Sequence, residues 1–222
     1  MENNILVDNI SLFDEILSLE DESISKVEIN GNCSLNIFDK EIKELNIIVN
    51  DNSSLIVNYF SKVNINNCLI DIKVKSNSSC KFNYSFINED NYDLKFNTDF
   101  LGVNSSIIIN VNSLNDKGIT NIDVDGYVKK DNINNYLDEN IRVININGAK
   151  ASGKPNMYID TSLVIANHNT VIGNINKDEL FYLMSKGLSK DKAIKLICDG
   201  FIVSNISDKE MVVKIKEYLN GR

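Results

Sequence analysis

The sequence predicts a mainly β fold, a parallel β-helix followed by a short helical segment, on three observations. An asparagine-serine turn that leads into a strand of alternating polarity recurs along the first two thirds of the chain. The 222 residues contain a single proline, so nothing interrupts a long stack of strands. From Asn176 onward the pattern becomes helical, with recognisable capping residues. These features together favour stacked coils closed on one face by helices.

The repeat is the tripeptide Asn-Ser-Ser or a close variant of it. Copies begin at Asn52, Asn77 and Asn104, with a fainter one at Asn32, so the steps are 20, 25 and 27 residues. Alternate side chains of a strand face one side of the sheet, so stacking the copies would bury one continuous core. The inward residues are expected to be Leu55, Val57, Tyr59; Cys80, Phe82, Tyr84; and Ile107, Ile109, Val111. Short strands at even spacing also suit an antiparallel sandwich or barrel, which the repeat alone does not exclude.

The chain divides into three parts by pattern. Residues 1–25 form a short N-terminal segment, in which Leu12, Phe13, Ile16 and Leu17 have helical spacing and predict a helix over 9–20. Residues 26–173 form the β-helix core, and residues 174–222 form the C-terminal helical segment.

Three helices are predicted in that last segment. Asn176 with Glu179, and Ser207 with Glu210, have the spacing of capping boxes, and Ser189 is a third N-cap. The first helix has an apolar stripe of Leu180, Phe181, Leu183 and Met184. The second is expected to turn Ala193, Ile194, Leu196 and Ile197 inward, and in the third Val212, Ile215 and Leu219 share a face. Lys186 and Gly187 supply a basic last turn and a left-handed stop for the first helix.

Charge and hydropathy exclude several classes of function. The net charge is -8 and there is no basic run, which argues against a nucleic-acid partner. The sequence has no apolar run near the ~20 residues of a membrane span and no signal-peptide pattern at its start, so we expect a cytoplasmic protein. The four cysteines lie far apart, outside any zinc-site spacing, and are expected to be free and buried, although Cys33 would fall in an exposed turn. Cys80, on the inward face, is expected to be a small core hydrophobe.

Catalytic patterns are also missing. There is no phosphate-binding glycine loop and no nucleophile elbow, and one histidine cannot form a metalloprotease motif. Acidic pairs such as Asp123/Asp125 and Asp138/Glu139 are neighbours in sequence, but nothing in the sequence shows that they converge. The sequence therefore predicts a protein that is not an enzyme.

The stretch from Pro155 to Ile202 resembles the C-terminal region of the SufB/SufD family of iron-sulfur cluster assembly proteins. The matching residues occur in the family's order: Pro155, Ile159, Asp160, Ala166, His168, Gly173, Leu180, Phe181, Tyr182, Leu183, Ser185 and Gly187. The resemblance implies a right-handed β-helix with terminal helices. It also implies a scaffold subunit that pairs with a SufB-like subunit or with itself. A tightly bound cofactor is not expected, but a transient iron-sulfur cluster or iron at the partner interface is.

The resemblance assigns a role to His168, with Asn167 and Asn169 beside it. The family has a histidine here, at the interface between SufB and SufD, so His168 is the candidate cluster and metal residue. A bridging role between coils is the alternative. This chain has asparagine on both sides, and it has no cysteine between Cys80 and Cys198 to supply the thiolate that holds clusters. It is therefore more similar to SufD than to SufB.

The resemblance also implies that the first terminal helix docks the SufC ATPase. The candidate docking residues are Phe181, Tyr182, Leu183, Ser185, Lys186 and Gly187. The alternative is that the apolar face of this helix plugs the open end of the solenoid. A polysaccharide-active or purely structural β-helix is the competing interpretation of the whole chain, and the sequence lacks the groove of stacked charged residues that such enzymes use.

Overall fold

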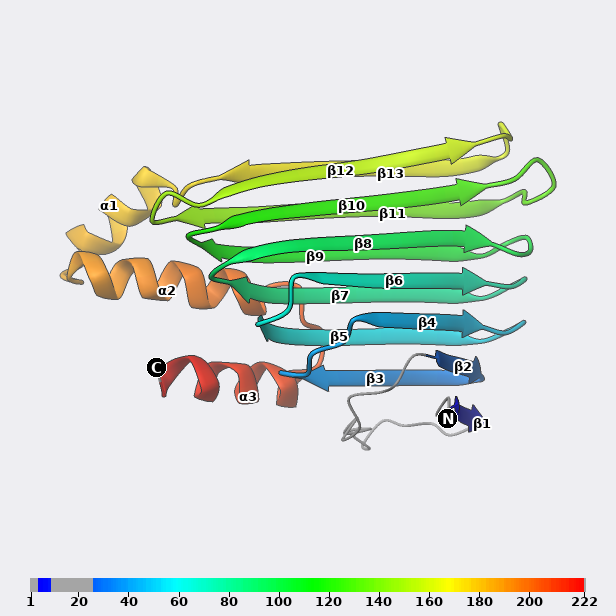
Figure 1. Ribbon diagram of the computed structural model, residues 1–222, viewed down its shortest axis with the longest axis horizontal. Helices are drawn as coiled ribbons and strands as arrows, with labels where there is room; N and C mark the ends of the chain where they lie inside the picture. Colours follow the sequence, from blue (N-terminus) through cyan, green and yellow to red (C-terminus); the bar gives the residue numbers. More distant parts are fainter. Residues whose placement is uncertain (1–3, 9–25, 222) are drawn as a thin grey trace.

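The computed structural model describes residues 4–8 and 26–221, and shows two parallel β-sheets stacked face to face with helices along one side (Figure 1). From β2 onward, successive strands alternate between the two sheets, so each coil gives one strand to each. Every strand pair that these residues form is parallel. The predicted parallel β-helix is confirmed, and the antiparallel alternative is wrong.

The elements have the following bounds. The seven-stranded sheet contains β1 (Asn4–Asp8), β2 (Lys26–Asn30), β4 (Glu44–Val49), β6 (Asn67–Val74), β8 (Asn91–Phe100), β10 (Ile119–Val128) and β12 (Lys150–Ile159). The six-stranded sheet contains β13 (Val164–Gly173), β11 (Asn135–Ile146), β9 (Ser106–Asp116), β7 (Ser79–Asn88), β5 (Ser54–Val63) and β3 (Asn32–Phe38). The helices are α1 (Lys177–Ser185), α2 (Lys190–Val203) and α3 (Lys209–Asn220). The helix expected over 9–20 lies outside the described residues.

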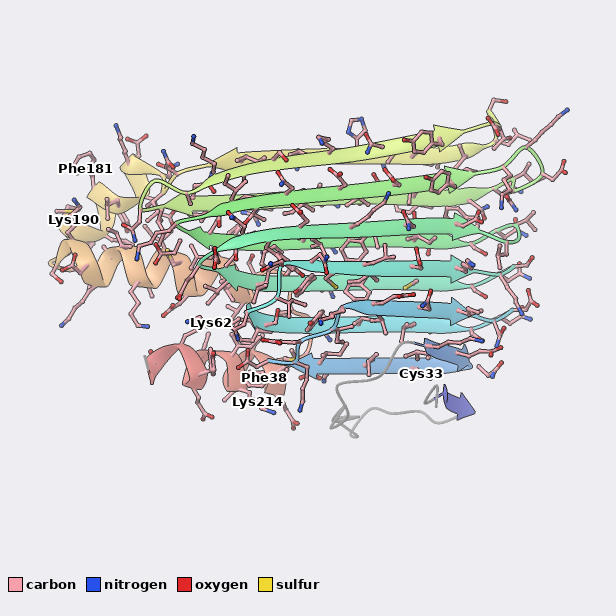
Figure 2. All side chains as sticks on the ribbon, in the orientation of Figure 1. Cys33, Phe38, Lys62, Phe181, Lys190 and Lys214 are labelled. Atoms are coloured by element: carbon pink, nitrogen blue, oxygen red, sulfur yellow. The ribbon has the colours of Figure 1, made fainter. Side chains whose placement is uncertain are left out.

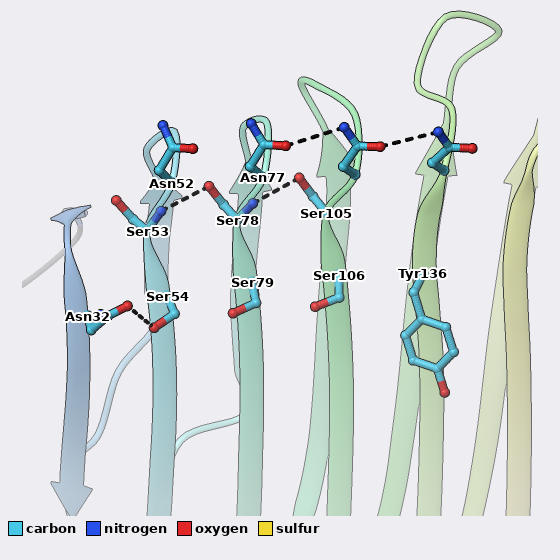
Figure 3. A pocket seen from close by; sticks show the side chains of 12 residues that line it. Asn32, Asn52, Ser53, Ser54, Asn77, Ser78, Ser79, Ser105, Ser106 and Tyr136 are labelled. Carbon is cyan, nitrogen blue, oxygen red and sulfur yellow. Dashed lines mark hydrogen bonds between the residues drawn. The ribbon is translucent and has the colours of Figure 1, made fainter.

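The repeated asparagine sets the turn that leads into each strand of the six-stranded sheet. Asn52, Asn77, Asn104 and Asn134 have φ values of 57°, 57°, 57° and 59°, a left-handed conformation that asparagine tolerates well. The serines that follow join the coils, because the Ser53 amide donates to Oγ of Ser78 at 3.2 Å (Figure 3). Like residues therefore stack on like, as the repeat predicted.

The core lies between the two sheets and follows the predicted inward positions. Leu55 is in register with Cys80, and Cys80 with Ile107, and all three side chains are buried. Tyr59 stacks on Tyr84 with ring centroids 4.2 Å apart and planes 3° apart. Such stacked aromatic pairs stabilise a core beyond the area that they bury.

The predicted alignment of the first copy was wrong by two residues. Cys33 is in register with Leu55 rather than with Ser53, so it points inward and is only 8% exposed instead of lying in an exposed turn. The turn before β3 is made by Gly31 with φ of 89°, and it is shorter than the Asn-Ser turns. A shift of two residues keeps the alternation of the strand, and it moves Cys33 from the turn position of Ser53 to the first inward strand position, that of Leu55.

A second apolar core lies outside the sandwich, between the helices and the six-stranded sheet. Phe60, Ile87 and Leu114 near the ends of β5, β7 and β9 are packed with α2 and α3. The helical side of this core consists of Cys198, Phe201, Ile202, Ile206, Met211, Ile215 and Leu219. The helices thus cover a lateral face of the stack. Leu196, predicted to face inward, is 54% exposed.

Polar contacts fix α2 to the sheet. Ser85 on β7 donates to the Ile202 carbonyl at 2.6 Å, and Asn112 on β9 donates to the Phe201 carbonyl at 2.9 Å. Asn205, just after α2, donates to the carbonyl of Tyr84 at 3.2 Å. The first two bonds give carbonyls of the last turn of α2 a partner on the sheet, and the third joins the residue after the helix to β7.

Two of the three predicted N-caps are confirmed. Asn176 accepts from the amides of Asp178 and Glu179, and Ser189 accepts from the amide of Lys192. The cap predicted at Ser207 is wrong.

The cap of α3 is Asp208, which accepts from the Met211 amide at 2.7 Å. The Ser207 hydroxyl instead donates to Oδ1 of Asn58 on β5 at 2.9 Å. The Ser207 side chain therefore does not cap α3, because it is engaged in a hydrogen bond to a distant strand.

Candidate functional site

The last coil, made by β12 and β13, is the candidate site because it contains His168. The alternation on β13 determines where this histidine points. Ala166 packs on the main core, and the Thr170 methyl would lie 3.0 Å from a Cβ built on Gly153 of β12. Both flanking residues therefore face the interior, and His168, halfway between them, shares that face. No strand covers it on the far side within the described residues, so His168 is exposed.

Glu139 lies one coil below His168. The two residues are register partners in the β11–β13 pairing, and Glu139 is in turn the partner of Ile109 on β9. Glu139 thus occupies a core position that holds Phe82 and Val57 in earlier coils. Its side chain is 0% exposed, and neither carboxylate oxygen has a hydrogen-bond partner.

Burial raises the pKa of the Glu139 carboxyl from 4.5 to about 8, with smaller contributions from the charges of Asp125 and Asp138. Taking a carboxylate out of water disfavours its charged form, so the proton is retained at neutral pH. A protonated carboxyl explains how this side chain is tolerated among apolar neighbours.

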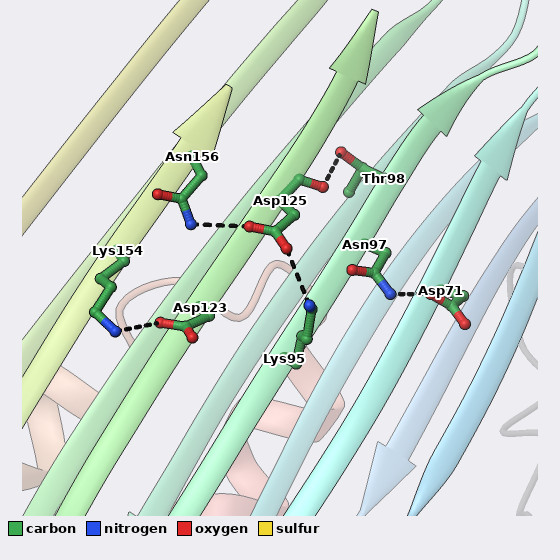
Figure 4. Close-up of polar contacts among 8 residues, drawn as sticks. All are labelled: Asp71, Lys95, Asn97, Thr98, Asp123, Asp125, Lys154 and Asn156. Atoms are coloured by element: carbon green, nitrogen blue, oxygen red, sulfur yellow. Dashed lines mark hydrogen bonds and ion pairs between the residues drawn. The ribbon is translucent and has the colours of Figure 1, made fainter. Parts of the chain in front are cut away.

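The outer face of the same region holds a second buried acid with a different environment. Asp125 on β10 is 7% exposed, but its carboxylate lies 3.0 Å from Nζ of Lys95 and accepts from Nδ2 of Asn156 at 2.8 Å (Figure 4). Asp123 on the same strand lies 3.6 Å from Nζ of Lys154. Asp125 and Asp123 are therefore each paired with a lysine of a neighbouring coil, whereas Glu139 inside has no ion pair among the described residues.

Sequence reasoning missed Glu139. It grouped Asp138 with Glu139 as adjacent acids, although alternation places them on opposite faces of β11. The signal that could have found Glu139 is the repeat itself, because the fourth copy at Asn134 puts Glu139 in line with Ile109. An acid at an inward position of an otherwise apolar row stands out once the copies are aligned.

Asn167 and Asn169, which were predicted to act with His168, do not lie on the same face of β13 as this histidine. Asn167 and Asn169 are exposed and lie on the opposite face of β13 from His168. Asn167 donates to the Tyr136 hydroxyl at 3.5 Å. Asn169 is the register partner of Asn140, which ends a ladder of hydrogen-bonded asparagines: Asn36, Asn58, Asn83, Asn110 and Asn140.

The helix α1 presents most of the predicted docking residues to solvent. Phe181 is 65% exposed and Tyr182 is 60% exposed, and α1 has no buried residue, so it does not plug the open end of the solenoid (Figure 2). The Lys186 ammonium lies 5.4 Å from the centre of the Tyr182 ring. Leu183 is half-buried, and its carbonyl accepts from the amide of Leu188 at 3.3 Å.

The end of α1 is a Schellman motif. Gly187 has φ of 95°, and its amide donates to the Met184 carbonyl at 3.0 Å. The Ser185 hydroxyl donates to the Tyr182 carbonyl at 2.7 Å. These bonds hold α1 in shape without help from the sheets.

The cysteines are not part of this site. All four side chains are buried, which was expected for each of them except Cys33, and burial raises the pKa of Cys68 and Cys80 to about 12. Within residues 4–8 and 26–221, no three His, Cys, Asp or Glu side chains are grouped to hold a metal ion.

A surface groove of about 460 Å³ runs along the Asn-Ser turns (Figure 3). Its lining is hydroxyl and amide groups with Tyr136 at one end. These groups bond between coils, as in the Asn134 to Asn104 contact at 3.2 Å, so the groove is explained by the stacking itself. Among the described helices, none is long and apolar enough to cross a bilayer.

Comparison with known proteins bears on the same part of the chain. Residues 105–201 match a family model described as SUF system FeS cluster assembly, SufBD core domain. A curated relative, an iron-sulfur cluster assembly SufBD family protein of Pyrococcus horikoshii, is 47% identical over 55 residues. That alignment covers 24% of this chain and 12% of the relative, so it spans a small part of the relative's length. Residues 105–201, from the end of the turn before β9 into α2, are therefore similar to the SufBD core domain, whose family takes part in FeS cluster assembly.

Proposed function

We propose that this chain is a non-catalytic scaffold subunit of the SUF iron-sulfur cluster assembly complex. In this proposal the last coil pairs with a SufB-like subunit or a second copy of the chain, and α1 docks a SufC-type ATPase. Iron or a nascent cluster is the cargo, held transiently near His168. The observation that carries the proposal is that the matched core domain ends in two exposed surfaces, the open coil and α1.

The open coil has the properties of a pairing surface. Within the described residues β12 and β13 are each the last strand of a sheet, so each has one edge of unpaired backbone groups. Apolar side chains remain exposed there, including Ile165 at 63% and Val171 at 53%. Exposed apolar sheet edges bind another chain readily, and a partner of matching shape would cover this one.

The helix α1 has the properties of a docking element. Phe181 and Tyr182 form an aromatic surface that is mostly exposed to solvent in the isolated chain. Aromatic residues of this kind are typical anchors when a helix enters a groove on a partner. The capped ends of α1 keep the helix formed before binding, which reduces the entropic cost of docking.

The test is co-purification with the SufC-type ATPase of the same cell. Truncation after Asn174 would also expose Phe60, Ile87 and Leu114, so point variants are the sharper choice. We expect the double variant Phe181→Ser with Tyr182→Ser to lose ATPase capture while the melting temperature stays near that of the wild type. Leu196→Ser on α2, whose side chain is 54% exposed, is the matched control and should still capture the ATPase.

Capture by the wild type that survives in the Phe181 and Tyr182 double variant would overturn the role of α1. Failure of the folded wild type to capture any ATPase would overturn the proposed function.

Pairing is tested separately by size-exclusion chromatography with light scattering. Ile165→Asp should convert the dimer or heterodimer to monomer, whereas the Leu196→Ser control should not.

A further inference from the structure

We infer that Asn147 is a site of spontaneous deamidation in the folded chain, and that the reaction loosens the last coil. The site lies in the turn between β11 and β12, where Asn147 is followed by Gly148. An asparagine that precedes a glycine is prone to this reaction, because glycine has no side chain to hinder attack by its own nitrogen. The inference does not depend on the proposed function, because the reaction needs only water.

The reaction passes through a cyclic imide. The backbone nitrogen of Gly148 loses its proton to solvent and attacks Cγ of Asn147, which closes a succinimide ring. The bond from Cγ to Nδ2 breaks, and the side-chain nitrogen takes a proton from water and leaves as ammonia. Water then opens the ring. Opening at Cγ gives aspartate, and opening at the main-chain carbonyl gives isoaspartate, in which the chain runs through the side-chain carbon atoms.

The chain has three Asn-Gly pairs, and the structure distinguishes them by the state of the attacking amide. The Gly31 amide donates to Oγ of Ser53 at 2.9 Å, and the Gly221 amide donates to the Glu217 carbonyl at 3.1 Å. Each of these amides must break a hydrogen bond before it can react. The Gly148 amide has no hydrogen-bond partner among the described residues, so it is available for attack.

The repeated Asn-Ser turns are protected in the same way as the first two pairs. The serine amides that would attack are bonded to side chains of the next coil: Ser53 to Oγ of Ser78, Ser78 to Oγ of Ser105, and Ser105 to Oδ1 of Asn135. Stacking therefore shields the asparagines of the repeat. Asn147 lies outside the repeat and lacks this protection.

The turn at Asn147 also has room to move. Asn147 and Gly148 are exposed, and a Cβ built on Gly148 would meet no atom within 4 Å beyond its chain neighbours. One main-chain hydrogen bond closes the turn, from the Ala149 amide to the Ile146 carbonyl at 3.0 Å. The main chain at Asn147 can therefore rotate until its side chain reaches the Gly148 nitrogen.

The product would disturb the contact that ties this turn to the coil below. Nδ2 of Asn147 donates to Oδ1 of Asp116, the last residue of β9, at 2.6 Å. Deamidation replaces this donor with a carboxylate, so a hydrogen bond becomes a repulsion between two negative charges. Isoaspartate also lengthens the turn that leads into β12. Among the described strands β12 is paired with β10 alone, so a change in this turn loosens it readily.

The test is incubation of the purified full chain at mildly alkaline pH for several weeks, followed by peptide mass spectrometry of the three Asn-Gly sites. Asn147 should react at least about fivefold faster than Asn30 and Asn220, because hydrogen bonds hold the attacking amides of the other two pairs. In denaturant the three sites should react at similar rates, since only local sequence then acts. Ser53→Ala removes the acceptor of the Gly31 amide and should speed the reaction at Asn30.

Variants of the turn test the consequence for the last coil. Asn147→Asp introduces the charge of the product, whereas Asn147→Gly cannot deamidate and suits the positive φ of 51°. Hydrogen exchange of the β12 amides should quicken in Asn147→Asp and in the aged wild type. It should stay near the fresh wild-type rate in Asn147→Gly, before and after ageing. Adding Asp116→Asn to Asn147→Asp restores one amide and one carboxylate and should return the exchange toward that rate.

The inference is overturned if Asn147 in the folded chain reacts no faster than Asn30 and Asn220. It is also overturned if Asn147 keeps the same advantage in denaturant, because the fold would then not be the cause. Unchanged exchange of the β12 amides in Asn147→Asp would refute the loosening of the last coil. Failure of Asp116→Asn to restore the exchange would refute repulsion as its origin.

Discussion

Glu139 on β11 and Gly126 on β10 face each other across the interior of one coil, and the carboxyl fills space that the glycine leaves free. A Cβ at Gly126 would lie 2.6 Å from Oε1 of Glu139 and 2.5 Å from Cδ2 of Leu137. Asp125, the residue before Gly126, points outward and is paired with Lys95. The coil thus contains one acid that is neutralised by a partner and one that is kept neutral by its own proton.

The raised pKa of Glu139 makes stability depend on pH. The folded-state pKa of about 8 lies above the ordinary value of 4.5, so folding favours the protonated form. The free energy of unfolding is therefore highest, with respect to this group, below pH 4.5. It falls as the pH rises toward 8, by at most about 5 kcal/mol. The charges of Asp125 on β10 and Asp138 on β11 act on this carboxyl from the outward faces of their strands, and His168 is its register partner on β13.

Glu139→Gln should therefore flatten the pH profile. In urea titrations between pH 5 and pH 9, the wild type is expected to lose stability with rising pH, and the variant to lose much less. The Asp138→Asn control removes only the smallest of the three contributions to this pKa and should keep most of the wild-type slope. Equal slopes for the wild type and Glu139→Gln would show that this carboxyl does not hold its proton in the folded state.

Gly126→Ala should destabilise the fold by about 1–3 kcal/mol, because the added methyl group overlaps the Glu139 carboxyl and the Leu137 side chain. Adding Glu139→Ala should recover part of the loss, which a double-mutant cycle from thermal unfolding would measure. Gly200→Ala in α2, where nothing lies within 4 Å, should be neutral or stabilising. Additive effects of the first two changes would contradict the contact.

Asn205→Ala should loosen α2 from the sheet at a cost of about 1–3 kcal/mol. The amide of Asn205 donates to the carbonyls of Tyr84 and Asn110, both at 3.2 Å, and these acceptors would be left partly buried without it. Hydrogen exchange of the α2 amides should quicken. Asn46→Ala, which removes an exposed contact with Glu44, should change neither stability nor exchange. Unchanged exchange in Asn205→Ala would mean that apolar packing alone holds the helix.

The thiols should be unreactive in the folded chain. Burial raises the pKa of Cys68 and Cys80 to about 12 and that of Cys198 to about 11, so almost no thiolate exists at pH 8. Ellman's reagent is expected to titrate essentially no thiol in buffer and all four in denaturant. Rapid labelling of Cys80 in buffer would contradict its place in the core.

Much of the fold follows from local patterns. The Asn-Ser turn needs a residue that tolerates positive φ, as Asn52 and Asn77 do, and the alternation after it assigns Leu55 and Cys80 to the core. The helix caps at Asn176 and Ser189 are equally local. His168 could be named from sequence because it is the single histidine in a recognisable strand, and the exposure of Phe181 and Tyr182 is compatible with the docking role assigned to them.

Other features could not be predicted, because they depend on residues far apart in the chain. Ser207 has the sequence of a cap, but Asn58 competes for its hydroxyl from β5. Cys33 turns inward because a shorter turn shifts its register by two residues against the later copies. The helices lie along the side of the stack because Phe60 and its neighbours expose an apolar surface there.

The sequence by itself determined the kind of coil, the way coils stack, and the existence of the terminal helices, because each depends on interactions within a turn or between equivalent positions of a repeat. Only the tertiary structure decided that Glu139 is buried opposite Gly126 and beneath His168, with no partner of its own. The energy of a charged group depends on everything packed around it, and those neighbours come from three strands that the sequence does not place together.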